Sequence, residues 1–209
     1  MNAGPHLRFE RAAMRRGFRL VAGVDEVGRG PLAGPVAAAA VILDPGNLPC
    51  GVDDSKALRA RARETACEEI FARAHAVSIA FVEAAEIDRV NIRQASHMAM
   101  RRALAGLSEP PAWALVDGND MPAGLGCPGE TIVKGDARSL SIAAASIVAK
   151  VMRDRLMARM HLRHPAYGFH LHAGYATRAH LEAIAAHGPC EIHRMSFSPL
   201  RQRNLFAGA

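Results

Sequence analysis

Three acidic residues stand directly after apolar segments that the sequence pattern predicts to be buried. Asp25 and Glu26 follow the apolar run 20–24 in the stretch VAGVDEVGRGPLAGP, and Asp117 follows the run 112–116. Carboxylates removed from water are costly unless another group compensates their charge, and carboxylates that converge on one point repel each other. These positions therefore predict a site that binds something positively charged.

A fourth acid, Asp154, lies in a segment with helical periodicity. The apolar residues that precede it at spacings of three and four are Ala144, Ile147 and Val151. Residues at these spacings share one face of a helix. The pattern predicts that Asp154 continues an apolar stripe facing the sheet, while Arg153 and Arg155 point elsewhere.

Carboxylates at two strand ends and on one helix face can meet at a single point. A hard divalent cation, Mg²⁺ or Mn²⁺, takes oxygen ligands and removes their repulsion. Two such ions about 3.5–4 Å apart form the arrangement used for phosphodiester cleavage. The alternative is that each acid pairs with an arginine. Neighbouring side chains of a regular strand face opposite ways, so Asp25 and Glu26 share one site only if the strand ends or bends between them.

These acids depend on a scaffold in which strands first follow one another and then alternate with helices. Strands are expected at residues 19–24, 35–43, 77–84, 112–117 and 131–136. Helices are expected at residues 61–76, 85–107, 141–164 and 177–187. This order predicts an α/β fold, a mixed sheet with helices packed on it.

The composition is that of a folded protein with a polyanionic partner. Half of the 209 residues are hydrophobic, 22% are charged, and the formal net charge is +6. The four cysteines are widely scattered without a C-x-x-C pair, which favours reduced thiols over disulfides or structural zinc. The opening residues lack the apolar core of a signal peptide, and the longest apolar run, 35–43, is too short to span a bilayer. A cytoplasmic protein is expected.

The chain resembles ribonuclease HII, the type 2 ribonuclease H of bacteria, from about residue 19 to 197. The resemblance rests on GVDEVGRGPLAGPVAAAAVIL, DDSKAL, LVDGN, VKGD, SLSIAAASIVAKVMRDRLM and YGFHLHAGYATRAHLEAIAAHGPCEIHRMSF, which occur in this order. It implies an RNase H-like fold, in which helices flank a central five-stranded mixed sheet, with a C-terminal helical extension. The implied parts are a basic N-terminal segment (1–18), a catalytic domain (19–164) and the extension with its tail (165–209).

The resemblance also implies the function. It predicts a metal-dependent endonuclease that hydrolyses the RNA strand of RNA–DNA hybrids. It further predicts cutting 5′ to ribonucleotides embedded in duplex DNA, leaving 3′-hydroxyl and 5′-phosphate ends. The residues implied to be catalytic, and to hold two Mn²⁺ or Mg²⁺ ions, are Asp25, Glu26, Asp117 and Asp154.

The implied substrate-binding residues lie in three separate segments. Gly28, Arg29 and Gly30, together with Tyr175, are expected to read the 2′-hydroxyl that distinguishes RNA from DNA. Lys56 is expected to contact a phosphate. The chain departs from the family at residue 173, where alanine stands in place of a frequent lysine before the Gly-Tyr pair.

Several alternatives stay open on the sequence alone. A related nuclease or transferase with another substrate preference would share the fold, and a basic hybrid-binding module would share the charge. The tail contains Gln202, Leu205 and Phe206 in a Gln-x-x-Leu-Phe arrangement similar to peptides that dock on the bacterial sliding clamp. The same apolar pair could instead fold back on the protein's own surface. The histidines between 161 and 172 have imperfect zinc-site spacing and are expected to line a basic surface, with His172 near the substrate.

Overall fold

The computed structural model describes residues 4–53, 55 and 58–201, and it is built around one mixed sheet. The five strands are β1 (Val21–Val27), β2 (Val36–Ile42), β3 (Ala76–Val82), β4 (Trp113–Asp117) and β5 (Gly129–Ile132). Their order in the sheet is β3-β2-β1-β4-β5. The first three strands form an antiparallel meander, and β4 and β5 add to β1 in parallel.

Strand β2, which lies between β1 and β3, explains why helices cover both faces of this sheet. Its seven residues, VAAAAVI, are all buried. Because successive side chains alternate between faces, Ala38, Ala40 and Ile42 enter one core, while Ala39 and Val41 enter the other. The small alanines allow a helix to lie close to each face.

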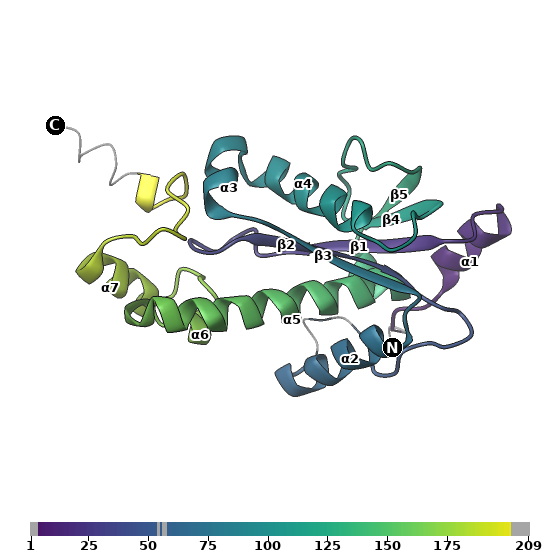
Figure 1. Ribbon diagram of the computed structural model, residues 1–209, viewed down its shortest axis with the longest axis horizontal. Helices are drawn as coiled ribbons and strands as arrows, with labels where there is room; N and C mark the ends of the chain where they lie inside the picture. Colours follow the sequence, from purple (N-terminus) through teal and green to yellow (C-terminus); the bar gives the residue numbers. More distant parts are fainter. Residues whose placement is uncertain (1–3, 54, 56–57, 202–209) are drawn as a thin grey trace.

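Helices α3 (Ala84–Val90) and α4 (Ile92–Ala105) cover one face, and α2 (Ala60–Arg73) and α5 (Leu140–Arg163) cover the other (Figure 1). The close approach of α5 to β1 depends on Gly23, where a side chain would collide with the backbone of Ser141 and Ile142. No helix in the described part of the chain is long and apolar enough to cross a membrane.

Helix α1 (Arg8–Arg15) lies within the N-terminal segment, for which only basic character was expected. Its Glu10 is buried and accepts hydrogen bonds from both the amide and the hydroxyl of Ser141, at 2.9 and 2.7 Å, and from the hydroxyl of Ser139 at 2.6 Å. The carboxylate therefore caps the N-terminus of α5.

The C-terminal part consists of η2 (Pro165–Tyr167), α6 (Phe169–His172) and α7 (Arg178–His187). Tyr167, Phe169 and Ile184 form a core together with Leu32 and Ala33 of the segment that joins β1 to β2. In Figure 1 this part lies beyond the sheet, at the end of α5. The proposed boundary between residues 164 and 165 stays a prediction.

The structure corrects two of the expected elements. The helix expected at 85–107 is two helices, because Asn91 adopts φ 71° and its side chain accepts a hydrogen bond from the amide of Gln94 at 3.1 Å. Asn91 thus ends α3 and caps α4. The strand expected at 131–136 is β5, which ends at Ile132, and Gly135–Ala137 form the 3₁₀ turn η1. Lys134, at φ 55°, turns the chain between them.

Candidate active site

The parallel pairing of β1 and β4 brings two of the predicted acids together. Val24 pairs with Val116, so Asp25 and Asp117 follow at the next position of each strand. The carboxyl ends of neighbouring parallel strands lie at the same edge of a sheet, where α/β proteins commonly bind ligands. Asp25 is 6% exposed and lines a cavity with Glu26, Asp117 and Ser146 of α5. The structure thus brings Asp25 and Asp117 together, as the strand ends predicted, and Glu26 lines the same cavity.

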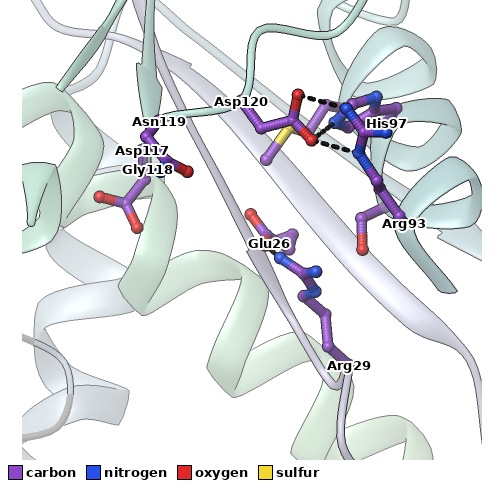
Figure 2. A pocket seen from close by; sticks show the side chains of 10 residues that line it. Glu26, Arg29, Arg93, His97, Asp117, Gly118, Asn119 and Asp120 are labelled. Carbon is purple, nitrogen blue, oxygen red and sulfur yellow. Dashed lines mark hydrogen bonds and ion pairs between the residues drawn. The ribbon is translucent and has the colours of Figure 1, made fainter. Parts of the chain in front are cut away.

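The strand does not end or bend between Asp25 and Glu26, because β1 continues to Val27. Asp25 lines the cavity on the α5 side, whereas Glu26 and Asp117 line both this cavity and a second one on the α4 side. Figure 2 shows Glu26 and Asp117 in the second cavity. Asp25 and Glu26 share one site because the site lies at the edge where β1 and β4 end and is open to both faces of the sheet.

The electrostatics of the three acids show a deficit of positive charge. Burial, and then repulsion by Glu26 and Asp117, raise the pKa of Asp25 well above its usual range. Burial also raises the pKa of Glu26, against the opposing effect of Arg29, whose guanidinium lies 3.1 Å from the carboxylate. Burial, followed by repulsion from Asp136, raises the pKa of Asp117, although the amide of Gly135 donates to it at 2.6 Å.

A divalent cation fits this donor set. The three side chains offer only carboxylate oxygens, the ligands preferred by Mg²⁺ and Mn²⁺, and a cation would offset the burial and the repulsion that raise their pKa values. Within the described residues no three His, Cys, Asp or Glu side chains are already arranged to hold an ion. The fit therefore rests on the chemistry and the mutual repulsion of the acids.

The expected orientation of Asp154 is wrong. Its side chain is 36% exposed and bonds to Lys150 at 2.8 Å, with Arg63 at 3.9 Å. Arg153, which was expected to point elsewhere, is fully buried. At this end α5 packs against the segment that joins β1 to β2, and Arg153 continues the inner face because backbone carbonyls of that segment accept its hydrogen bonds. Asp154 lines an adjoining cavity that shares Lys150 and Tyr175 with the cavity of Asp25.

Four of the five predicted substrate-binding residues lie beside the acids. Gly28 is buried at φ 88°, and Arg29 and Gly30 are exposed. A side chain on Gly30 would contact the ring of Tyr175, which is 42% exposed and lines the cavity of Asp25. Loop and tyrosine are thus adjacent although they are distant in sequence. Lys56 lies outside the described residues.

Several residues of the site were not predicted from the sequence. Ser55 bonds to Ser146 at 2.8 Å, and both line the cavity of Asp25 together with Arg63 and Lys150. Arg63 donates to the carbonyl of Ser55 at 2.9 Å. The sequence contained a signal for one of them, because Lys150 precedes Asp154 by one helical turn.

The second cavity contains a further charged cluster that the sequence did not reveal. Arg93 donates two hydrogen bonds to Asp120, at 2.6 and 2.9 Å, and His97 lies 3.1 Å from the same carboxylate (Figure 2). The bonds from Arg93 lower the pKa of Asp120 to about 2. These contacts fasten the loop after Asp117 to α4. Of the histidines between 161 and 172, His170 and His172 line the cavity of Asp154 and Tyr175, and the expected place of His172 near the substrate stays a prediction.

Comparisons with known proteins agree with this arrangement. The family model described as Ribonuclease HII matches residues 22–199. The ribonuclease HII of Agrobacterium fabrum is 56% identical over 202 residues, which cover 97% of this chain and 93% of the relative. That of Sinorhizobium fredii is 61% identical over 198 residues, which cover 95% of this chain and 85% of the relative.

Solved structures confirm the expected fold. Ribonuclease H2 from Pyrococcus horikoshii matches with a TM-score of 0.76 and 26% identity, over 91% of this chain and 100% of that one. The complex of PCNA with RNase HII from Archaeoglobus fulgidus matches with a TM-score of 0.72 and 27% identity, over 86% and 96% of the two chains. Bst-RNase HIII in complex with Mn²⁺ shares the fold, with a TM-score of 0.71 and 20% identity over 97% and 75% of the chains. The chain therefore belongs to the ribonuclease HII family, the metal-dependent endonucleases that cleave RNA in RNA–DNA hybrids and at ribonucleotides embedded in DNA.

Proposed function

We propose that Asp25, Glu26 and Asp117 are the catalytic carboxylates that hold the divalent cations, and that Asp154 completes the set. The observation that carries this assignment is that three carboxylates, one buried and two half-buried, line one cavity at the adjacent ends of β1 and β4. Asp154 lies in the adjoining cavity, paired with Lys150. When bound, two Mn²⁺ or Mg²⁺ ions would supply an activated water and stabilise the leaving oxygen.

The side chains around the acids prepare the site for a phosphodiester. Lys150 and Arg63 place positive charge between the cavity of Asp25 and that of Asp154, where they would attract the phosphate and hold it in place. The amide of Gly135 and the hydroxyl of Ser146 orient the carboxyl groups of Asp117 and Asp25. We propose that cleavage occurs 5′ to the ribonucleotide and leaves 3′-hydroxyl and 5′-phosphate ends.

A duplex with one embedded ribonucleotide tests the reaction. With Mn²⁺ or Mg²⁺ the protein should cut it once, and EDTA should stop cleavage without releasing the duplex. Extension by a polymerase identifies the 3′-hydroxyl end, and sensitivity to a phosphatase identifies the 5′-phosphate end. Cleavage that persists in EDTA, or a 3′-phosphate end, would contradict the metal assignment.

We further propose that Gly28, Arg29, Gly30 and Tyr175 read the ribose, and that Lys56 contacts a phosphate. The support is the adjacency of the exposed loop and the exposed tyrosine at the edge of the cavity of Asp25. Tyr175→Ala should reduce cleavage at a single ribonucleotide more than it reduces duplex binding, and Tyr175→Phe separates the hydroxyl from the ring. Equal losses in cleavage and binding would limit Tyr175 to a structural role.

The cellular setting follows from the substrate. We propose that the protein works in the cytoplasm on chromosomal DNA and contacts the sliding clamp through Gln202, Leu205 and Phe206. These three residues lie outside the described part of the chain, so the support is the Gln-x-x-Leu-Phe sequence and the PCNA complex of the archaeal relative. A peptide of residues 201–209 should bind the clamp, and alanines at Leu205 and Phe206 should abolish binding without lowering the melting temperature. A lower melting temperature without clamp binding would instead place the tail in the core.

A further inference from the structure

Two fully buried arginines lie beneath the segment that joins β1 to β2. Arg153 comes from α5, and Arg194 comes from the chain after α7. Within the described residues neither guanidinium makes a salt bridge with a carboxylate, and both donate to backbone carbonyl groups. Burying a charge is costly. Hydrogen bonds of this number, all directed at backbone carbonyls, therefore indicate that the two arginines have a specific role.

Arg194 bonds directly to the loop proposed to read the ribose. It donates to the carbonyl of Gly28 at 2.6 Å, to that of Arg29 at 3.0 Å and to that of Gly34 at 2.9 Å. Its own amide donates to the carbonyl of Leu32 at 2.8 Å. Arg194 therefore holds this loop and also the part of the segment that leads into β2.

Arg153 connects the same segment to the tyrosine. It donates to the carbonyls of Ala33 and Pro35, at 3.2 and 2.9 Å, and to that of Ala173 at 3.0 Å. Ala173 adopts φ 49° and lies two residues before Tyr175. The two arginines thus hold both halves of the proposed ribose-reading surface in one rigid arrangement.

Peptide geometry determines which groups the loop offers to a ligand. In a planar trans peptide the carbonyl of one residue and the amide of the next point in opposite directions. The carbonyls of Gly28 and Arg29 point inward to Arg194, so the amides of Arg29 and Gly30 point away from it. Both residues are exposed, and neither amide donates to another described group. The loop therefore presents two adjacent N–H donors, an arrangement suited to an oxygen acceptor.

Arginine is suited to this position in a way that lysine is not. Its planar guanidinium carries five donors in a fixed fork, whereas a lysine ammonium is a compact point charge. Burial, and then the charge of Arg153, lower the pKa of Arg194 to about 9, so the group stays charged at neutral pH. Gly28 and Gly34 leave the room that this packing needs, because a side chain on Gly28 would collide with Arg153 and one on Gly34 with Met157.

We propose that Arg194, together with Arg153, is a positioning residue for ribonucleotide selectivity: by binding the loop carbonyls it directs the amides of Arg29 and Gly30 toward the ribose. This inference rests on the proposed function of the loop and Tyr175. It assigns the selectivity to a buried residue that touches no substrate.

The first test compares wild type with Arg194→Lys in Ca²⁺, which prevents cleavage, by measuring binding to a duplex with one ribonucleotide and to the same duplex in all-DNA form. The variant should lose about tenfold or more of the preference for the ribonucleotide, because a displaced loop forfeits its hydrogen bonds, while all-DNA binding stays unchanged. In Mg²⁺, kcat/KM at the single ribonucleotide should fall by at least the same factor, with the lost affinity appearing in KM. Unchanged preference and kcat/KM would overturn the proposal.

Two further variants make the result specific. Ile184→Val removes one methyl group from the same C-terminal core, so it should lower the melting temperature and leave the preference intact. Tyr175→Ala tests the proposed function itself. If it loses the preference and Arg194→Lys keeps it, only the positioning role fails. If Tyr175→Ala also keeps the preference, the proposed ribose-reading surface is wrong.

Amide NMR of the wild type provides a measurement that does not depend on the folding of a variant. The amide resonances of Arg29 and Gly30 should shift on binding the ribonucleotide-containing duplex and stay in place with the all-DNA duplex. Equal shifts with both duplexes would overturn the proposed direction of the amides. If Arg194→Lys does not fold, Arg153→Lys is measured in the same way, with the same expected loss.

Discussion

At the scale of single residues, the site is defined by acids that the protein alone does not neutralise. Asp25 is buried beside two other carboxylates, and its raised pKa means that the folded state disfavours its ionised form. A group whose folded pKa is raised contributes stability at low pH and loses it as the pH rises through that pKa. Without metal, a carboxyl group at this buried position therefore reduces the stability of the fold as the pH rises. At this position a carboxyl group lowers the stability of the metal-free protein, whereas the proposed activity requires it.

Asp25→Asn should abolish cleavage and raise the melting temperature of the metal-free protein at neutral pH. Wild type should be stabilised by Mn²⁺, because a ligand that binds only the folded state shifts the unfolding equilibrium. The variant should lose most of this response. Melting curves in EDTA and in Mn²⁺ measure both effects, with the exposed Asp44→Asn as the matched control. Near-normal turnover of Asp25→Asn at saturating Mg²⁺ would refute the metal-binding assignment.

Asp154→Asn should be milder than Asp25→Asn. Its carboxylate is partly exposed and already paired with Lys150, so it contributes to the site without being buried among like charges. We expect activity, or apparent metal affinity, to fall about 10- to 100-fold, because a ligand carried by a helix can position an ion without being its main anchor. Titration of activity with Mn²⁺ measures both quantities. A complete loss that excess metal does not restore would make Asp154 a principal ligand.

At the scale of elements, the position of α5 determines the geometry of the site. The helix carries Ser146, Lys150 and Asp154, and it packs on β1 next to Asp25. Its N-terminus is held by the buried Glu10 of α1, which lies far from these residues in the sequence. The segment before the family match thus contributes to the placement of catalytic side chains.

Glu10→Ala should lower the free energy of unfolding by about 1–3 kcal/mol, because it leaves buried donors of Ser139 and Ser141 without an acceptor. Glu10→Gln keeps an acceptor oxygen and removes the charge, so its loss should be smaller. Urea unfolding of both variants measures the difference, with the exposed Arg8→Ala as control. If Glu10→Ala is as stable as wild type, Glu10 does not cap α5.

At the scale of the whole molecule, the C-terminal part is joined to the rest by buried polar contacts as well as by an apolar core. His180 and His193 bond to each other through their Nε2 atoms at 3.1 Å, and His180 also bonds to the carbonyl of Tyr175 at 2.8 Å. This chain connects the proposed ribose-reading tyrosine to the segment that carries Arg194. Loss of these contacts should therefore affect stability and selectivity together.

Burial, and then the imidazole of His180, lower the pKa of His193 to about 4 from 6.5. The unfolded state therefore binds a proton that the folded state does not between these pH values, and stability falls as the pH falls. The loss contributed by His193 should reach about 2–3 kcal/mol from pH 7 to pH 4. His193→Asn should flatten this part of the pH profile of urea unfolding. A variant profile parallel to that of wild type would show that His193 does not titrate in this range.

The sequence by itself determined the family, the order of most elements and the three clustered acids. The acids could be identified because a strand end marked by an apolar run and an acid is a local feature, and neighbouring parallel strands bring such ends together. The break at Asn91 was not predicted, because 85–107 has continuous helical composition and one residue of positive φ interrupts it.

Tertiary structure alone decided which face of α5 is buried beyond the sheet. Apolar periodicity assigned Asp154 to the inner face and Arg153 to the outer one, and the reverse holds, because at that end the neighbours are the carbonyls of residues 33, 35 and 173. A hydrophobic pattern describes packing against side chains and contains no information about backbone acceptors supplied by distant segments. Only the folded chain shows that Arg194 bonds to the carbonyls of Gly28 and Arg29, and that Arg153 packs against Gly28.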